Sequence, residues 1–330
     1  MKKILVTGAT GYIGHQLTRK LANSGHTVNV LIRHQSDAAL FNDPNIKVFY
    51  GDITAPETIR EAIKGCEQVY HTAGYAKLWA KDPSVFYEIN VNGTKNVFWE
   101  ALNAGVRKLV YTSSAAVFGP SFNSLICEKD PRMISFRSDY DLSKQLAEYQ
   151  VKEFAQNGLF SVIVNPTRVY GPGLLSHSNA FCRMLLDGMK GKVVFVPGGK
   201  SVVSNYAFID DVVDGHIKAM QWGISGERYI LGGENVAYEE VLRILKSQVK
   251  KIRLIPLSLN TMQLLGYLEL IRNKISGLEP LITPAAAKRF FLDATFSNDK
   301  AIRQLSYSIT PFNVGLKQTI DYVNTIHHGK

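Results

Sequence analysis

The sequence predicts an α/β fold built on a doubly wound parallel sheet, followed by a smaller second domain. Up to about residue 165, short apolar runs alternate with amphipathic helical stretches. The runs are apolar throughout, as strands buried on both faces require, and helices separate them, as parallel neighbours require. They span residues 4–7, 28–32, 46–50, 69–73, 109–113 and 161–164. We therefore expect a ligand site at the carboxyl ends of these strands.

The first run opens into a glycine-rich turn and then into a helical stretch. Glycines stand at positions 8, 11 and 14, in the pattern G-x-x-G-x-x-G. We expect Gly8 to make the tight turn, Gly11 to leave room for a pyrophosphate, and Gly14 to let the helix pack closely on the strand. A helix N-terminus after such a turn aims free N–H groups at a phosphate. The stretch therefore predicts a dinucleotide-binding site.

The residue after the second run indicates which dinucleotide binds. Arg33 stands there, where an acidic residue would bind the ribose 2′-hydroxyl of NAD. An arginine instead pairs with the 2′-phosphate of NADP. NADP is favoured over NAD, and the alternative is an arginine that is only solvated at a strand end.

The third and fourth runs end in residues that suit the rest of a dinucleotide. Asp52 can accept a hydrogen bond from an adenine amino group, although an aspartate in a turn often bonds its own backbone. Thr72, Ala73 and Gly74 are small enough to let the backbone approach a cofactor. His71 is expected to pack within its strand rather than act in catalysis.

The fifth run and the helix after it carry groups that can move a proton. The hydroxyl residues Thr112, Ser113 and Ser114 stand at the end of the fifth run. Tyr140 and Lys144 lie four residues apart, on one face of a helical stretch. We expect the ammonium of Lys144 to lower the pKa of the Tyr140 phenol and make it a general acid and base. By itself such a pair is also common on exposed helix surfaces.

Together, the glycine turn, the serines after the fifth run and the Tyr–Lys pair resemble the extended branch of the short-chain dehydrogenase/reductase superfamily, which includes the NAD-dependent epimerase/dehydratase proteins. The resemblance implies a Rossmann-type fold, catalysis by Ser114, Tyr140 and Lys144, and binding of the nicotinamide ribose by Lys144. It also matches Asn90 to a structural asparagine and places Pro166 and Val169 against the nicotinamide. The full expected cofactor-binding set is Gly8, Thr10, Gly11, Tyr12, Ile13, Gly14, Arg33, Asp52, Ile53, Thr72, Ala73, Gly74, Asn90, Tyr140, Lys144, Pro166 and Val169.

Within this branch, residues 75–83 and Arg33 are most similar to dihydroflavonol 4-reductase-like proteins. Residues 203–211 lack the arginine with which sugar-nucleotide epimerases grip a diphosphate, and Ser114 is not followed by the acidic pair of sugar dehydratases. The main hypothesis is an NADP-dependent reductase of a ketone or aldehyde. The alternatives are an NAD-dependent sugar-nucleotide 4-epimerase and a nonenzymatic NADP-binding sensor or scaffold.

The expected domains are residues 1–170 for the dinucleotide, with segments near 204–233 returning to it, and mainly 171–330 for a small-molecule carbonyl or alcohol substrate. Expected substrate contacts are Tyr75, Trp79, Ser114, Phe118, Tyr170, Phe181 and Tyr206. Residues 84–102 and 139–156 resemble the helix pair that forms the family's dimer interface, so we expect a homodimer.

Composition and charge argue against several other classes of protein. The formal charge is +10, but lysines and arginines are dispersed and no nucleic-acid-binding motif accompanies them. Three scattered cysteines predict neither a disulfide framework nor a metal site. The first apolar run is too short for a signal peptide and no stretch is long enough to span a bilayer, so we expect a cytoplasmic protein. The apolar stripe in residues 255–275 is expected to pack on the core rather than lie on a membrane.

Overall fold

A seven-stranded, fully parallel sheet forms the main layer of the computed structural model, which describes residues 1–176, 178–199, 201–249 and 252–328. The strand order is β10-β6-β5-β4-β1-β2-β3. The strands are β1 (Lys3–Thr7), β2 (Thr27–Ile32), β3 (Ile46–Tyr50), β4 (Gln68–His71), β5 (Lys108–Thr112), β6 (Ser161–Pro166) and β10 (Arg228–Leu231). The order reverses between β1 and β4, so the expected doubly wound fold is confirmed.

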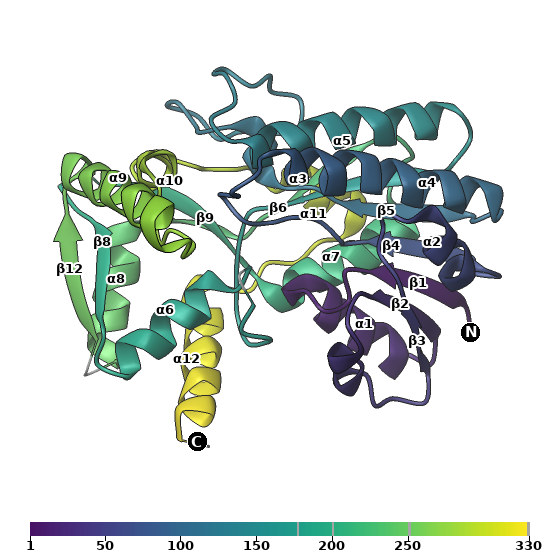
Figure 1. Cartoon of the computed structure of the whole chain (residues 1–330), viewed down its shortest axis with the longest axis horizontal. Helices are drawn as coiled ribbons and strands as arrows, with labels where there is room; N and C mark the ends of the chain where they lie inside the picture. The colour runs from purple at the N-terminus through teal and green to yellow at the C-terminus, as the bar shows by residue number, and fades with distance from the viewer. Residues whose placement is uncertain (177, 200, 250–251, 329–330) are drawn as a thin grey trace.

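Helices cover both faces of this sheet (Figure 1). On one face lie α1 (Tyr12–Asn23) and α7 (Ile209–Trp222), and on the other lie α2 (Pro56–Ile63), α4 (Thr94–Asn103) and α5 (Asp139–Gln156). Along β1, Ile4 and Val6 enter the first core whereas Leu5 enters the second. This alternation between two buried layers explains why the strand sequences are apolar throughout.

The second part of the chain builds two small sheets beside the carboxyl edge of the large one. One has the order β11-β9-β7 and the other pairs β12 with β8. These strands are β7 (Arg168–Tyr170), β8 (Val193–Pro197), β9 (Val203–Phe208), β11 (Glu234–Ala237) and β12 (Arg253–Leu257). The helices are α6 (Ala180–Met189), α8 (Tyr238–Gln248), α9 (Leu259–Ser276), α10 (Pro284–Arg289), α11 (Asp299–Leu305) and α12 (Phe312–His328). The chain crosses between the two parts, because β10 returns to the large sheet whereas β9 pairs with β7 and β11.

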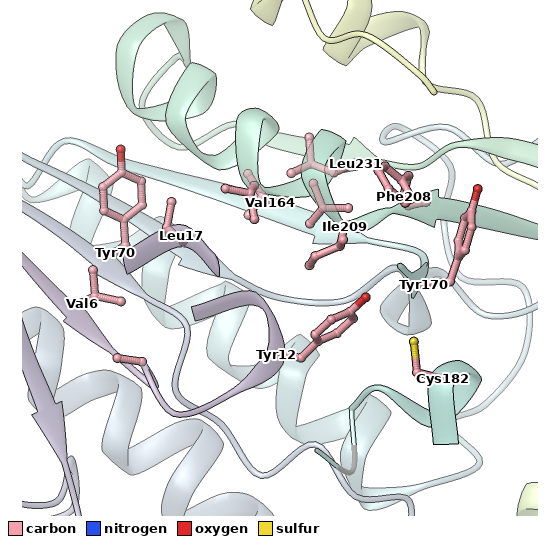
Figure 2. Packing of buried hydrophobic residues seen from close by; sticks show 14 of the residues in the cluster. Val6, Tyr12, Leu17, Tyr70, Val164, Tyr170, Cys182, Phe208, Ile209 and Leu231 are labelled. Carbon is pink, nitrogen blue, oxygen red and sulfur yellow. The ribbon is translucent and has the colours of Figure 1, made fainter. Parts of the chain in front are cut away.

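A buried junction joins the glycine turn to the second part. The hydroxyl of Tyr12 donates to the carbonyl of Gly171 at 2.6 Å, and the thiol of Cys182 donates to the same oxygen at 3.0 Å. Figure 2 shows Tyr12 and Cys182 pointing to the chain just after Tyr170. The start of α1 is therefore held directly against the chain that follows β7.

The apolar stripe near residue 260 departs from expectation. It forms α9, which buries Met262 and Gly266 but leaves Leu264, Leu268 and Ile271 more than half exposed. The prediction that this stripe packs on the core is therefore wrong for its outer face. None of the helices described is long and apolar enough to cross a membrane.

Candidate active site

The glycine turn has the geometry that a bound pyrophosphate needs. Gly8 has a φ of +74°, and a Cβ there would lie 2.5 Å from the backbone nitrogen of Ala73. A Cβ on Gly14 would lie 2.2 Å from the carbonyl oxygen of Gly8, so only glycine lets α1 approach β1 this closely. A Cβ on Gly11 would meet only that same oxygen, at 3.1 Å, which leaves its other sides open.

The N-terminus of α1 is free to bind an anion. Its N-cap, Gly11, provides no side-chain hydrogen bond, and no acidic residue occupies its first turn. The first N–H groups of the helix therefore carry partial positive charge without a side-chain acceptor. The side chains of Tyr12 and Ile13 point away from this N-terminus into packed surroundings, because Tyr12 is buried in the junction and Ile13 packs against the core. Thr10 is half-buried on the turn.

Arg33 and Asp52 both stand at the carboxyl edge, after β2 and β3. Arg33 is exposed and makes no ion pair within the described ranges. Asp52 Oδ1 accepts hydrogen bonds from the backbone N–H and the hydroxyl of Thr54, both at 2.9 Å, which is the turn arrangement weighed as its alternative role. Ile53, next to it, is buried.

A buried polar network supports the wall after β4. His71 is fully buried, with Thr7 Oγ1 at 2.7 Å and Thr94 Oγ1 at 3.0 Å, and burial lowers its pKa to about 3, with a further contribution from Lys144. It is therefore a neutral packing residue. Thr72 donates to the carbonyl of Thr7 at 2.7 Å.

Asn90 ties this wall to α5 from an irregular turn. It lies in a π-helical segment, Glu88–Gly93, between the short α3 (Ser84–Tyr87) and α4. Its Oδ1 accepts from the backbone N–H of Tyr75 at 2.7 Å, and its Nδ2 donates to Ser143 at 2.9 Å. Because a Cβ on Gly74 would lie 3.0 Å from both Asn90 Oδ1 and Lys144 Nζ, this wall must be narrow beside the lysine.

Ser114 and Tyr140 are brought together at the end of β5. The Ser114 hydroxyl accepts a hydrogen bond from the backbone N–H of Ala116 at 3.2 Å and caps a short 3-10 turn, Ala115–Phe118. Tyr140 lies in the first turn of α5, which Ser138 caps. Burial raises the pKa of Tyr140, whereas a hydrogen bond with Ser114 and the charge of Arg289 act in the opposite direction.

Lys144 lies one turn after Tyr140 on α5 and is buried. Its Nζ donates to the carbonyl of Thr112 at 2.9 Å and to the hydroxyl of Tyr111 at 3.4 Å. Burial lowers the pKa of Lys144 to about 8, although the charge of Glu148 opposes this. The expectation that Lys144 lowers the pKa of Tyr140 is corrected. The pKa of Tyr140 is raised because burial outweighs the other effects, and the positive charge that acts against burial is that of Arg289.

Glu148 lies one turn after Lys144 and was not anticipated. It is completely buried and accepts hydrogen bonds from Ser113 at 2.5 Å and Asn165 at 2.6 Å, with Arg228 at 3.4 Å. This carboxylate is the negative charge that favours the ammonium form of Lys144. The Lys–Glu spacing on one helix face was visible in the sequence, but its burial was not.

A cavity of about 210 Å³ opens beside Ser114. Pro166 lines it from the end of β6, and Leu78 and Phe296 add apolar surface. Four arginines also line it, namely Arg132, Arg137, Arg168 and Arg289. Asp141 bonds two of them, Arg289 at 3.1 Å and Arg132 at 3.7 Å. The wall is therefore mainly apolar with a basic rim, a composition typical of a small-molecule site.

The other expected substrate residues lie outside this lining. Tyr75 packs edge-on against Phe86, and its hydroxyl donates to the carbonyl of Trp79 at 3.4 Å. Phe118 is buried beneath the guanidinium of Arg228, 4.4 Å from its ring. The expectation that Phe118 contacts substrate is corrected, because its ring belongs to the core.

The remaining three aromatic residues form a cluster behind the cavity. Tyr170 packs against Phe181 and Tyr206, with ring centroids 5.7 and 6.3 Å away. Tyr170 and Tyr206 are buried, and Arg168 covers the ring of Tyr206 from the cavity side at 5.4 Å. Tyr170 and Tyr206 are therefore corrected to packing residues, whereas Phe181 is only partly buried. Val169, between Arg168 and Tyr170 in β7, packs against the core and is not part of the lining.

The sequence of this chain is similar to a known protein family and to several characterised proteins. The model of the NAD-dependent epimerase/dehydratase family matches residues 4–232. Sterol demethylase protein B of Methylococcus capsulatus is 36% identical over 246 residues, which cover 73% of each chain. The putative dihydroflavonol 4-reductase of Synechocystis sp. is 31% identical over 243 residues, covering 72% of this chain and 69% of that protein.

A solved structure extends the likeness of fold to nearly the whole chain. The dTDP-glucose 4,6-dehydratase DesIV from Streptomyces venezuelae, with NAD and TYD bound, superposes with a TM-score of 0.82 at 21% identity. The match covers 99% of this chain and 98% of that one.

Proposed function

Since the chain belongs to the NAD-dependent epimerase/dehydratase family and is therefore an NAD(P)-dependent oxidoreductase, we propose that it reduces a ketone or aldehyde with NADPH. The observation that carries this proposal is that Ser114, which lines the cavity, interacts with the buried hydroxyl of Tyr140. Membership of this family of enzymes also argues against a purely nonenzymatic sensor or scaffold.

The residues present fit a nicotinamide dinucleotide. Gly8, Gly11 and Gly14 would hold the pyrophosphate at the start of α1, Asp52 would face the adenine, and Lys144 would hold the nicotinamide ribose. Pro166 would lie against the nicotinamide at the cavity wall. When bound, the cofactor supplies the hydride.

The side chains then have distinct roles. Ser114 donates a hydrogen bond to the substrate carbonyl oxygen as negative charge develops there. Tyr140 donates the proton that this oxygen takes up. Because burial raises its pKa, Tyr140 is protonated at neutral pH, as a general acid in the direction of reduction must be. Lys144 would position the ribose and contribute positive charge near the reacting centre.

NADP is the proposed cofactor rather than NAD. The support is Arg33, an exposed guanidinium without an ion pair in the described structure, at the place where NAD-binding folds carry an acidic residue. Dissociation constants for NADPH and NADH, measured by fluorescence titration of the purified protein, test this choice. Equal affinities would refute it.

The proposed reaction is tested with a panel of carbonyl compounds while NADPH oxidation is followed. The panel contains aryl ketones, oxosterols, β-ketoacyl compounds and sugar nucleotides. The variant Tyr140→Phe should lose turnover by about a hundredfold or more, because the proton donor is removed, while retaining NADPH binding. Equal turnover by the two proteins would refute the assigned role.

A sugar-nucleotide 4-epimerase remains the second candidate. The basic rim of the cavity favours it, because Arg168 and Arg289 would suit an anionic group of the substrate. Its signature would be NAD retained through purification, together with conversion of a sugar nucleotide without net oxidation of added NADPH. That result would replace the reductase proposal.

A further inference from the structure

The outer face of α9 carries a row of large apolar side chains that no other part of the described chain covers. Leu264, Leu268, Ile271 and Ile275 recur at helical spacing, and their exposed fractions are 59%, 52%, 54% and 83%. Tyr267 lies in the same row and is 57% exposed. We call these five residues, with Leu278 and Leu281 after the helix, the α9 face.

The α9 face is not needed to hold the helix in place. The opposite side of α9 is attached through a small core of Met262, Ala287 and Phe291. Gly266 lets the helix approach α10 so closely that a Cβ there would lie 2.7 Å from the backbone nitrogen of Pro284. A helix that is apolar on both its attached and its outward sides has a second surface to bury.

The apolar surface continues beyond the helix. Leu278 is 59% exposed and Leu281 is 88% exposed. Leu281 also lines a second cavity, of about 430 Å³, together with Phe195 of β8, which is 55% exposed. Figure 1 shows α9, α10, β8 and β12 gathered at the end of the molecule away from the N-terminus.

The charges around the α9 face are unbalanced towards positive. Its two nearby acids are neutralised, because Glu269 pairs with Arg272 at 2.6 Å and Glu279 pairs with Lys77 at 2.8 Å. Lys274 of α9 and Lys288 of α10, the helix packed against α9, are exposed and form no ion pair with the described residues. The face therefore combines apolar side chains with uncompensated cations.

From this combination we infer that the α9 face binds the surface of an anionic lipid bilayer. The apolar side chains would enter the boundary between headgroups and acyl chains, while Lys274 and Lys288 pair with lipid phosphates. A contact with a second copy would bury the apolar side chains but would offer Lys274 and Lys288 no unpaired acid of the same face, because Glu269 and Glu279 are already paired. An anionic bilayer instead complements both lysines.

With the α9 face on the bilayer, the candidate active site would lie close to the lipid. After Leu281 the chain enters α10, whose Ala285, Ala286 and Arg289 line the active-site cavity. Leu78 lines the same cavity, and its neighbour Lys77 holds Glu279. A lipid-dissolved substrate could thus reach the cavity from the bilayer, although membrane binding itself does not depend on the proposed reaction.

Co-sedimentation of the full chain with extruded vesicles tests the inference. Vesicles of phosphatidylcholine with about one third phosphatidylglycerol should bind the protein more strongly than vesicles of phosphatidylcholine alone. The double variant Leu268→Glu/Ile275→Glu should bind at least about tenfold more weakly, because it places two charges in the apolar boundary. Lys274→Ala/Lys288→Ala should reduce binding only to the anionic vesicles.

The matched control is Ile302→Glu, since Ile302 is 43% exposed on α11, outside the α9 face. It should bind vesicles as the parent protein does, and thermal unfolding should be alike for all variants because every altered side chain is exposed. Failure of the parent protein to bind vesicles would overturn the inference, as would equal binding by Leu268→Glu/Ile275→Glu. An oligomer dissociated by that double variant, without vesicle binding, would identify a self-association surface and also overturn it.

Discussion

Replacing Lys144 with methionine should stabilise the fold at neutral pH while removing activity. The side chains are similar in length, but methionine carries no charge into a site where Lys144 is only 4% exposed. Because burial lowers the pKa of Lys144 from 10.5 to about 8, its ammonium costs the folded state about 3 kcal/mol at pH 7, at about 1.4 kcal/mol for each pKa unit. The substitution removes this cost.

Part of the gain is offset by a lost contact. The Nζ group donates to the carbonyl of Thr112 at 2.9 Å, and leaving that buried oxygen without a partner costs about 1–3 kcal/mol. We therefore expect Lys144→Met to raise the free energy of unfolding at pH 7 by about 1 kcal/mol. Turnover should fall sharply, because the ribose loses its anchor.

The pH dependence gives the sharper test. Between about pH 8 and pH 10.5 the unfolded chain keeps the Lys144 proton while the folded protein loses it, so the parent protein gains stability as pH rises. Lys144→Met lacks this gain, so its unfolding free energy relative to the parent protein should fall by up to about 3 kcal/mol across that range, which turns its advantage of about 1 kcal/mol into a deficit. Urea unfolding, followed by tryptophan fluorescence at both ends of the range, measures the difference. A stability difference independent of pH would refute the reasoning.

The remaining predictions concern the cofactor site and the subunit interface. Arg33→Ala should weaken NADPH binding by about tenfold or more and leave NADH binding unchanged, as fluorescence titration would detect, because only NADPH carries the 2′-phosphate. Gly14→Ala should lower the free energy of unfolding by about 1–3 kcal/mol, since its Cβ would lie 2.2 Å from the Gly8 oxygen; an unchanged urea midpoint would contradict this. Trp99, 54% exposed on α4, and Tyr149, 59% exposed on α5, mark the proposed dimer interface, so Trp99→Lys should shift sedimentation from dimer to monomer. A parent protein that is already monomeric at micromolar concentration would rule out that interface.

The elements of the large sheet could be predicted because their signals are local. Strand runs that are apolar throughout reflect two buried faces, and the glycine spacing reflects contacts within the turn between β1 and α1. Tyr140 and Lys144 were recognisable together because four residues on a helix bring side chains to one face. Such patterns depend on neighbours within a few residues, so the sequence carries them directly.

The prediction that certain aromatic residues contact the substrate was wrong because it rested on position in the sequence alone. Phe118, Tyr170 and Tyr206 follow or precede the right strands, but position in sequence does not distinguish a ring that lines a cavity from one packed behind it. The arginines that line the cavity were also not predicted. Arg132 and Arg289 both pair with Asp141 there, although they are more than 150 residues apart in the sequence. Only the assembled fold brings those groups together.

By itself, the sequence predicted the doubly wound sheet, the glycine turn after the first strand and the Tyr140–Lys144 pair from local spacing and strand-end position, whereas Ser114 was singled out by the family resemblance. Tertiary structure alone decided the electrostatics of that pair. Burial raises the pKa of Tyr140 and lowers that of Lys144, because desolvation depends on atoms contributed by distant segments. It also decided that much of the apolar surface of α9 faces outward, since a helix with apolar residues on two sides does not reveal which side the rest of the chain covers.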